Sequence, residues 1–303
     1  MVVSVASALP AEASGRGRKR VGRPVPTFRA DGSPNVQSRS ALAIDLASGE
    51  AIYAKSADAP QPIASLSKLA AALVVVESGL RLEATSTITD VDRIVAKGGA
   101  RSRLLVGQTY SNDDLLHAAL LGSDNRAVSA LGRSAGLGAS ALAAAMTRKA
   151  RDLGLRHTRF EDPVGLSYGN VSTAREVLGL LRAALAHPLL AAILRKQTHV
   201  AMSVTPPRGA VPYRNTNQLL FRPGVAALGG KTGFNAPAGY CFVGAVRTGG
   251  REIAAAFLGA QGELTRFADF SRLLAWVGKP GGRGARPSGR GEAPSTVTAT
   301  TVR

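Results

Sequence analysis

Segments that favour β-strands lie at both ends of the folded part of this chain, and segments that favour helices lie between them. Residues 41–46 and 50–55 flank an Ala-Ser-Gly turn and predict a hairpin. Towards the other end, residues 229–232, 239–246 and 252–258 predict three more strands, and a Thr-Gly-Gly turn joins the last two. One antiparallel sheet completed by both ends of the chain, with the middle inserted between its halves, is the simplest assembly that fits this order.

Helix signals fill the middle of the chain. Ser111 with Asp114, and later Ser140, are typical of the first residues of helices, because side-chain oxygens there accept from amides that lack a partner. Thr173 and Glu176 have the spacing of a capping box. The middle is therefore predicted to form an inserted all-helical subdomain, with a cleft between it and the sheet.

Two more helices are predicted to pack against the sheet. One begins at Ser65 and ends at Gly79, and its residues 69–76 are apolar on every side, which is typical of a buried central helix. The other covers residues 263–277 and carries a stripe of apolar side chains that is typical of a core-facing helix. The predicted fold class is α+β: an antiparallel sheet flanked by helices, plus the helical subdomain.

The two ends of the chain differ from this body in composition. Residues 14–37 are rich in Gly, Arg and Pro and predict a flexible basic linker, and residues 278–303 predict a disordered Gly/Arg/Pro/Thr tail. Residues 1–13 are small and apolar with an Ala-x-Ala pattern, typical either of the end of a truncated secretory signal or of a disordered end. The predicted domain covers residues 38–277, with a sheet subdomain at about 38–79 and 198–277 and a helical subdomain at about 80–197.

Charge and the content of cysteine and histidine bear on partners and cofactors. The chain has 38 Lys and Arg against 20 Asp and Glu, a net charge of +18, which favours an anionic polymer such as nucleic acid, acidic lipid or cell wall as a neighbour. The single cysteine, Cys241, lies in an apolar run and is predicted to be buried and unreactive. No Cys/His spacing suggests a zinc site, so no metal or cofactor is predicted, and His117 and His157 are assigned no role.

Three short motifs carry the candidate chemistry. They are Ser65-Leu66-Ser67-Lys68, Ser123-Asp124-Asn125 and Lys231-Thr232-Gly233. Taken singly, each has an ordinary structural explanation, as an N-cap, a loop residue or a cross-strand ion-pair partner. Their order and placement favour one shared site, because the first opens a helix, the second lies at a helix–helix junction and the third lies on a strand.

Ser65 and Lys68 form a candidate nucleophile and base. Residues i and i+3 share one helix face, so the amine is predicted to lie beside the hydroxyl. A serine hydroxyl needs a base to take its proton, and an amine can do so only when neutral. Burial and the nearby cation of Lys231 would lower the pKa of Lys68 in the required direction. Amides from the start of the helix and from the strand of the third motif can form an oxyanion hole.

The other motif residues are candidates for substrate contact and proton transfer. Asn125 both donates and accepts, so it can bridge Lys68 and a substrate amide. Ser123 is placed to pass a proton to a leaving amine, and Lys231 with Thr232 can hold a substrate carboxylate.

The motifs and their surroundings resemble the D-alanyl-D-alanine carboxypeptidases and endopeptidases, the low-molecular-mass penicillin-binding proteins. The matching segments are residues 63–77, 115–127, 157–166, 170–174, 215–220 and 230–241. The resemblance implies a penicillin-binding/β-lactamase-like transpeptidase fold, a periplasmic or other extracytoplasmic location, and a Ser65 acyl-enzyme that cleaves D-alanyl bonds of peptidoglycan. It also implies that Gly233 is part of the substrate-binding motif, that the amides of Ser65 and Phe234 form the oxyanion hole, and that β-lactams are covalent inhibitors.

The resemblance leaves the preferred bond open. The larger carboxypeptidases of the family carry a further β-rich domain and an amphipathic anchor, and no segment after residue 277 is suited to either. We therefore expect the compact endopeptidase branch, which cuts crosslinks, and keep removal of terminal D-alanine as the alternative.

Two other functions fit the sequence less well. A class A β-lactamase needs a Glu-x-x-Leu-Asn segment between the second and third motifs, and the only Glu residues there, Glu161 and Glu176, lack that context. A non-catalytic basic protein that binds wall polymer or nucleic acid would not need an intact Ser65–Lys68 pair. No aromatic residue interleaves the basic tail, as base stacking would require.

Overall fold

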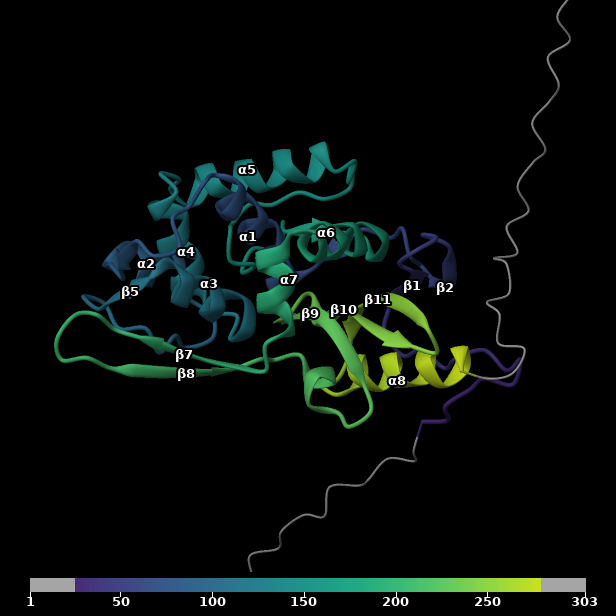
Figure 1. Ribbon diagram of the computed structural model, residues 1–303. Coiled ribbons are helices and arrows are strands. Elements are labelled where there is room, and N and C mark those ends of the chain that lie inside the picture. Colours follow the sequence, from purple (N-terminus) through teal and green to yellow (C-terminus); the bar gives the residue numbers. More distant parts are fainter. Residues whose placement is uncertain (1–24, 279–303) are drawn as a thin grey trace, which may run out of the picture.

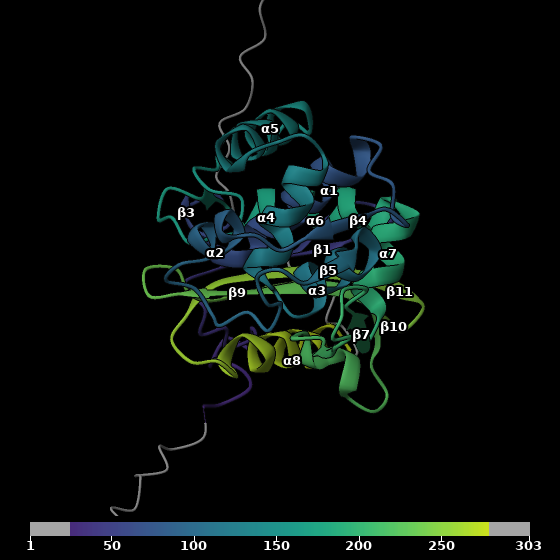
Figure 2. The ribbon, with the colours of Figure 1, turned by 90° about the vertical axis from the view of Figure 1, so that its left-hand side faces the viewer.

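The computed structural model describes residues 25–278. These residues form three layers, in which a five-stranded antiparallel sheet lies between one helix, α8 (Thr265–Val277), and a larger group of helices (Figures 1 and 2). The predicted signal segment, most of the predicted tail and the linker up to residue 24 lie outside the described residues.

The main sheet is built from both ends of the chain, as the sequence predicts. Its strands are β1 (Ser40–Asp45), β2 (Ala51–Lys55), β9 (Ala226–Asn235), β10 (Gly239–Thr248) and β11 (Arg251–Ala260). They are arranged in the order β2-β1-β11-β10-β9, so the first and last strands of the chain pair at the centre, from Ser40 opposite Leu258 to Asp45 opposite Ile253. The strand of the third motif, β9, therefore lies at one edge of the sheet.

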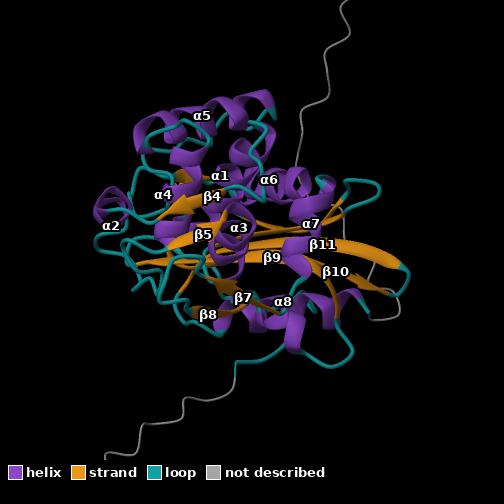
Figure 3. Cartoon of the chain, turned by 60° about the vertical axis from the view of Figure 1, so that its left-hand side comes forward, coloured by secondary structure: helices purple, strands orange, loops and turns teal. Residues whose placement is uncertain are grey.

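Alternate residues of the central strands face opposite layers, because successive side chains of a strand point to opposite sides. Phe242 and Phe257 face α8 and contact Phe270, and Phe242 also contacts Phe267. Their direct neighbours along the strands, such as Val243 and Ala256, face the larger group of helices and belong to its core. The predicted apolar stripe on the last helix is thus confirmed, and Figure 3 shows the sheet in orange between the two helical layers.

The helix α1 (Lys68–Glu77) is the buried central helix that the apolar run predicts. Seven of its ten residues are buried, and it packs against α5 (Ala139–Asp152) and α6 (Ala174–Ala186). Its start differs from the prediction, because a 3₁₀ turn, η1 (Ala64–Ser67), precedes it. Ser65 therefore lies in this turn, just before the α-helix.

The middle of the chain holds short strands in addition to helices. The remaining elements are β3 (Gln61–Pro62), β4 (Thr85–Thr87), α2 (Asp90–Val95), β5 (Thr109–Ser111), α3 (Asn112–Leu121), α4 (Asn125–Ser134), β6 (Val171–Ser172), α7 (Pro188–Arg195), β7 (Thr198–Met202), β8 (Ala210–Arg214) and η2 (Gln218–Phe221). The segment expected to be all-helical thus contains β4 and β5, which pair with each other, and β6, which pairs with β3. The helices α6 and α7 also contact strands of the main sheet, so both parts share one core.

The predicted helix starts agree with the structure only in part. Ser111 accepts from the amide of Asp114, and Thr173 caps α6, as expected. The Glu176 carboxylate does not complete a capping box, because it accepts from the backbone amide and ring of His157 instead. The prediction that Ser140 caps its helix is wrong, since α5 begins one residue earlier.

Part of the segment predicted as a flexible linker is packed against α8. Val36 is buried, and the backbone amides of Gln37 and Ser38 donate to the Asp269 carboxylate at 2.9 and 2.7 Å. The composition of residues 14–37 concealed this contact, because the partner carboxylate lies more than two hundred residues further along the chain.

The hairpin β7–β8 extends beyond the main sheet and packs on α3 (Figure 1). Within residues 25–278 no single helix has the length and apolar character needed to cross a bilayer. The helices α6 and α7 have the required length and composition only when taken together, and they meet at a bend of 104°.

Candidate active site

A cleft of about 750 Å³ lies between the edge strand β9, the turn η1 and the helical body. Its lining includes residues of all three motifs: Ser65, Ser123, Asn125, Thr232, Gly233 and, after the third motif, Phe234. Lys68 and Lys231 are each 1% exposed and lie buried close to it. The fold therefore brings every residue of the predicted site into one region.

Two glycines allow the chain to approach η1 closely on two sides. A Cβ atom at Gly165, whose φ is +87°, would lie 2.4 Å from the carbonyl oxygen of Ala64. A Cβ atom at Gly233 would lie 2.8 Å from the carbonyl oxygen of Ile63 and 3.1 Å from the amide nitrogen of Ser65. Because neither contact admits a side chain, Ser65 is held between a loop and β9, with the backbone of β9 beside its amide.

Backbone strain coincides with the two serines of the site. Ala64, directly before Ser65, has φ +49°, and Ser123 has φ +59°. Residues other than glycine adopt this region at a cost, and such strain is often found at functional sites. The strained backbone thus lies directly before one serine of the site and at the other.

Lys68 is placed to act on Ser65. Its Nζ lies 2.9 Å from Ser65 Oγ and donates to the carbonyl oxygen of Val164 at 2.5 Å. Burial lowers the pKa of Lys68 to about 7, although the carboxylates of Asp162 and Asp124 act in the opposite direction. A substantial fraction of this amine is therefore neutral at neutral pH, in contact with the hydroxyl it would deprotonate.

Lys231 is the second buried amine. Its Nζ donates to the carbonyl oxygen of Thr232 at 2.9 Å. Burial lowers its pKa well below the usual range, and the charges of Lys68 and Arg266 lower it further. Of the two causes that we expected, burial lowers the pKa of Lys68 as predicted, whereas the repulsion between the two amines lowers the pKa of Lys231.

The second motif is held by its central residue. The Asp124 carboxylate accepts from Tyr213 Oη at 2.9 Å and from Ser102 Oγ, and it caps α4. Ser123 Oγ is buried, and within residues 25–278 it has no hydrogen-bond partner. Among the described residues the Lys68 amine contacts Ser65 and the Val164 carbonyl, and no hydrogen bond joins it to Asn125, so the bridge from Asn125 through Lys68 to a substrate amide stays a prediction.

The third motif presents an open edge to the cleft. Thr232 Oγ1 donates to Thr216 Oγ1 at 2.7 Å. Phe234 is 54% exposed, and its ring stacks on that of Tyr240 at 4.2 Å. Phe234, directly after the motif, therefore lies exposed at the cleft.

Sequence reasoning missed Arg266, which lies on α8 and lines the cleft. It is 5% exposed; its Nη1 donates to the carbonyl oxygens of Gly233 and Cys241, and its Nε has no partner in the described chain. A buried cation beside Lys231 and Thr232 provides a favourable field for a substrate carboxylate. No local pattern marks Arg266, because only the packing of α8 on the sheet brings it here.

Asp162 is a second residue near the site that the sequence does not single out. Its Oδ1 accepts from the backbone amides of Val164 and Gly165, both at 2.6 Å, and so fixes the loop that turns the Val164 carbonyl towards Lys68. The Asp-Pro-Val-Gly sequence is a recognisable turn signal, but its target is not evident from the chain.

The carboxylates weighed for a β-lactamase lie elsewhere. Glu161 accepts from Ser167 Oγ, and Glu176 accepts from His157 and Thr158. Among the described residues that line the cleft there is no carboxylate. Cys241 is buried as predicted, and burial raises the pKa of its thiol to about 11.

Comparisons with known proteins agree with this geometry. Residues 27–262 match the peptidase family S11, described as D-alanyl-D-alanine carboxypeptidase. The chain is 36% identical over 244 residues to the D-alanyl-D-alanine endopeptidase of Escherichia coli, covering 80% of this chain and 78% of that protein.

Two solved structures share the fold. The DD-transpeptidase of Streptomyces K15 is 27% identical with a TM-score of 0.74, covering 80% of this chain and 97% of that one. The D-alanyl-D-alanine carboxypeptidase of Mycobacterium tuberculosis is 29% identical with a TM-score of 0.70, covering 84% and 93%. With the α+β fold and a cleft that collects all three motifs, these matches show that the chain belongs to the D-alanyl-D-alanine carboxypeptidase family of serine peptidases.

Proposed function

We propose that Ser65 is the acylated nucleophile of a DD-peptidase that acts on peptidoglycan, with crosslinks as its preferred substrate. The observation that carries the proposal is the buried Lys68 amine, with a pKa of about 7, at 2.9 Å from Ser65 Oγ. An amine that is neutral at neutral pH can take the hydroxyl proton as Oγ attacks the carbonyl carbon.

The remaining groups suit the steps that follow. The amides of Ser65 and Phe234 would stabilise the oxyanion, and the approach of β9 to the Ser65 amide supports this pairing. Ser123 would pass the proton from Lys68 to the leaving amine. As the amine leaves, the substrate acyl group remains on Ser65 as an ester. Asn125 would hold the substrate amide. The substrate carboxylate would be held by Lys231, Thr232 and Gly233. Water then hydrolyses the ester.

Acylation by a β-lactam tests the nucleophile. Labelled penicillin should add one adduct to the protein, and peptide mapping should locate it on Ser65. The Ser65→Ala variant, checked for folding by circular dichroism, should take none. An adduct on that variant, or none on the folded native protein, would remove the assignment.

The preference for crosslinks rests on similarity and charge. The E. coli relative bears the name D-alanyl-D-alanine endopeptidase, and a chain with a net charge of +18 suits a polyanionic mesh. Purified crosslinked dimers and monomeric pentapeptide would compete for the enzyme, and kcat/KM should be higher for the dimers. Dominant release of free D-alanine would instead support the carboxypeptidase alternative.

We further propose that the protein works in the periplasm or another extracytoplasmic compartment, where this substrate lies, and that its basic ends bind the wall. The location follows from the substrate. Binding to isolated sacculi should weaken as salt increases, because exposed charges are screened. Binding that does not depend on salt would contradict the proposal that the basic ends bind the wall through their charge.

A further inference from the structure

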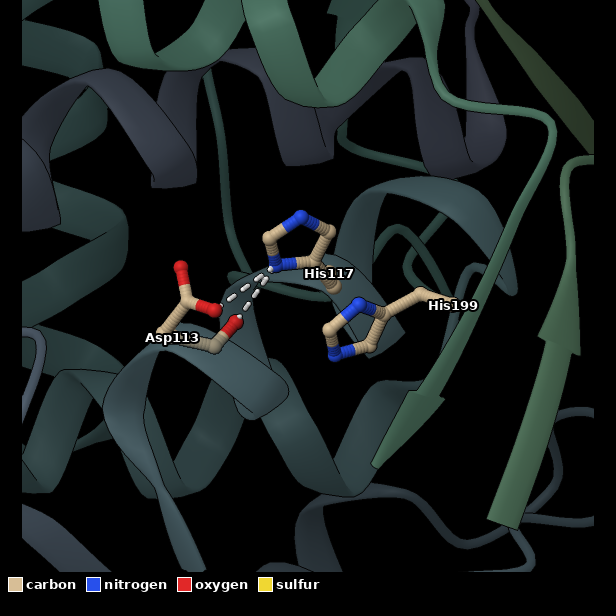
Figure 4. Close-up of side chains that lie close together, drawn as sticks. All are labelled: Asp113, His117 and His199. Carbon is tan, nitrogen blue, oxygen red and sulfur yellow. Dashed lines mark hydrogen bonds and ion pairs between the residues drawn. The ribbon is translucent and has the colours of Figure 1, made fainter. Parts of the chain in front are cut away.

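A second cluster of chemically capable side chains lies outside the cleft, between α3 and β7. It consists of Asp113 and His117 on α3 and His199 on β7, and one ligand atom from each lies within 4.8 Å of the other two. Asp113 and His117 are four residues apart, so they share one helix face. Figure 4 shows Asp113 beside the His117 ring, with the ring of His199 next to it.

The distances within the cluster are close to those of a metal centre. His117 Nδ1 lies 3.4 Å from Asp113 Oδ2, about the separation of two ligands that bind one zinc ion at roughly 2.0–2.1 Å in tetrahedral geometry. The rings of His117 and His199 are stacked, with centroids 3.9 Å apart and planes at 13°. One ligand atom of His199 lies within 4.8 Å of those of Asp113 and His117. To bind the same ion the His199 ring would have to tilt out of this stack, because an imidazole nitrogen binds a metal in the plane of its ring.

The groups behind the cluster match those that support metal ligands. His199 Nε2 lies 2.6 Å from Asp114 Oδ1, and the other oxygen of Asp114 accepts from the Met202 amide at 3.1 Å. A ligating histidine generally gives its second ring N–H to a carboxylate, which fixes the ring and its tautomer. With Nε2 engaged in this way, Nδ1 of His199 is the nitrogen left for a metal ion.

We propose that Asp113, His117 and His199 form a binding site for a zinc ion that ties the β7–β8 hairpin to α3. Two imidazoles and one carboxylate are ligands that Zn²⁺ takes readily, with water in the fourth position. Mg²⁺ and Ca²⁺ prefer oxygen ligands and fit this set poorly. The sequence does not indicate this metal site, because the third ligand is far along the chain from the other two.

Lys196 regulates the site. Its Nζ lies 3.0 Å from His117 Nε2, while His117 Nδ1 lies 2.9 Å from the carbonyl oxygen of Asp113. The ammonium can only donate, so it favours the tautomer with the proton on Nδ1, where the metal would bind. Lys196 is exposed and can move away. Zn²⁺ therefore binds in competition with Lys196.

The site is independent of the proposed function, and its test is a binding measurement. Tag-free full-length protein would be titrated with Zn²⁺ by calorimetry, with Mg²⁺ as the control ion. We expect one Zn²⁺ per chain, no response to Mg²⁺, and a rise in Tm of about 5 °C or more when Zn²⁺ is about a hundredfold above Kd. Visible absorption of Co²⁺ in its place would report tetrahedral geometry.

Four variants identify the ligands. His199→Ala and Asp113→Ala should each weaken binding by about a hundredfold, and Asp113 is partly exposed, so its removal spares the core. His157→Ala, which changes a histidine outside the cluster, should bind as the native protein does. Lys196→Gln removes the ammonium and offers an acceptor to Nε2, so it should bind about tenfold more tightly.

Two results would overturn the proposal. One is a native protein that binds no Zn²⁺ with a Kd below about 0.1 mM. The other is binding that persists unchanged in both His199→Ala and Asp113→Ala, because the ion would then lie elsewhere. Rings that serve only to pack α3 against β7 would give the first result.

Discussion

Two lysines, Lys68 and Lys196, each contact a neighbouring side chain, but one lysine is buried and the other is exposed. Lys68 is fully buried beside Ser65, and burial lowers its pKa to about 7. Lys196 reaches His117 from the surface and is exposed. The contact distances, 2.9 and 3.0 Å, are nearly equal. Burial, rather than contact, is therefore what suits the Lys68 amine to act as a base.

The largest expected effect is on the buried amine. Lys68→Arg should slow acylation of Ser65 by about 10²–10⁴-fold, because a guanidinium stays protonated and cannot act as a base. The rate of penicillin adduct formation, followed by intact mass, measures it. Lys196→Arg is the matched control and should change the rate by less than about twofold. A near-normal rate for Lys68→Arg would mean that another group takes the proton.

The pH dependence of acylation should report the same amine. Only the neutral form of Lys68 accepts a proton, so the rate should rise about tenfold per pH unit below pH 7 and level off above it. The rate constant would be measured from pH 5 to pH 9 on protein shown to remain folded. A rate that keeps rising to pH 9 would mean that the amine titrates much higher than its burial implies.

The buried amine should also cost stability, whereas the exposed one should not. The folded pKa of Lys68, about 7, lies below its unfolded value of 10.5, so between these values the unfolded chain binds more protons and the free energy of unfolding rises with pH. At pH 7 Lys68→Met should raise it by about 1–3 kcal/mol, and Lys196→Met should change it by less than about 0.5 kcal/mol. Urea unfolding measures the change in both variants. Equal changes would contradict the expected difference between the buried and the exposed lysine.

A smaller effect is expected in the loop around Val164, whose carbonyl oxygen accepts from Lys68. Asp162→Ala releases the amides of Val164 and Gly165, so the Val164 carbonyl should move and acylation should slow by about tenfold. Asp162→Asn keeps one acceptor and removes a charge that raises the pKa of Lys68, so it should shift the midpoint of the pH profile downward. Unchanged rates and midpoint in both variants would show that Asp162 neither positions the Val164 carbonyl for acylation nor raises the pKa of Lys68.

The smallest effect is expected at the ends. Removal of residues 1–24 and 279–303 should leave acylation by a small β-lactam within about twofold. Residues 14–24 and 279–303 have a Gly/Arg/Pro-rich composition with little apolar surface to pack, and residues 1–13 are predicted to be the end of a signal or a disordered end. A cut after residue 37 should instead destabilise the protein, since it removes Val36 and the Gln37 amide that contacts Asp269. Loss of acylation in the shorter trim would place an end within the site.

The sequence predicted most of the architecture, and the reasons are local. Alternating and continuous apolar runs indicated the strands and the buried helix, because side-chain period and burial follow directly from backbone geometry. The errors lie where a distant partner intervenes. Glu176 turns to His157 rather than completing a cap, and Asp269 orders a segment whose composition is typical of a linker.

The sequence by itself determined the family, the fold class and the eight residues of the predicted site, since spaced motifs encode which side chains a helix start or a strand presents. Only the tertiary structure decided their protonation and their neighbours. The burial that lowers the pKa of Lys68, the arrival of Arg266 from α8 and the stacking of His117 on His199 all depend on packing between distant segments. Desolvation and contact are properties of three-dimensional surroundings, and no local pattern in the chain encodes them.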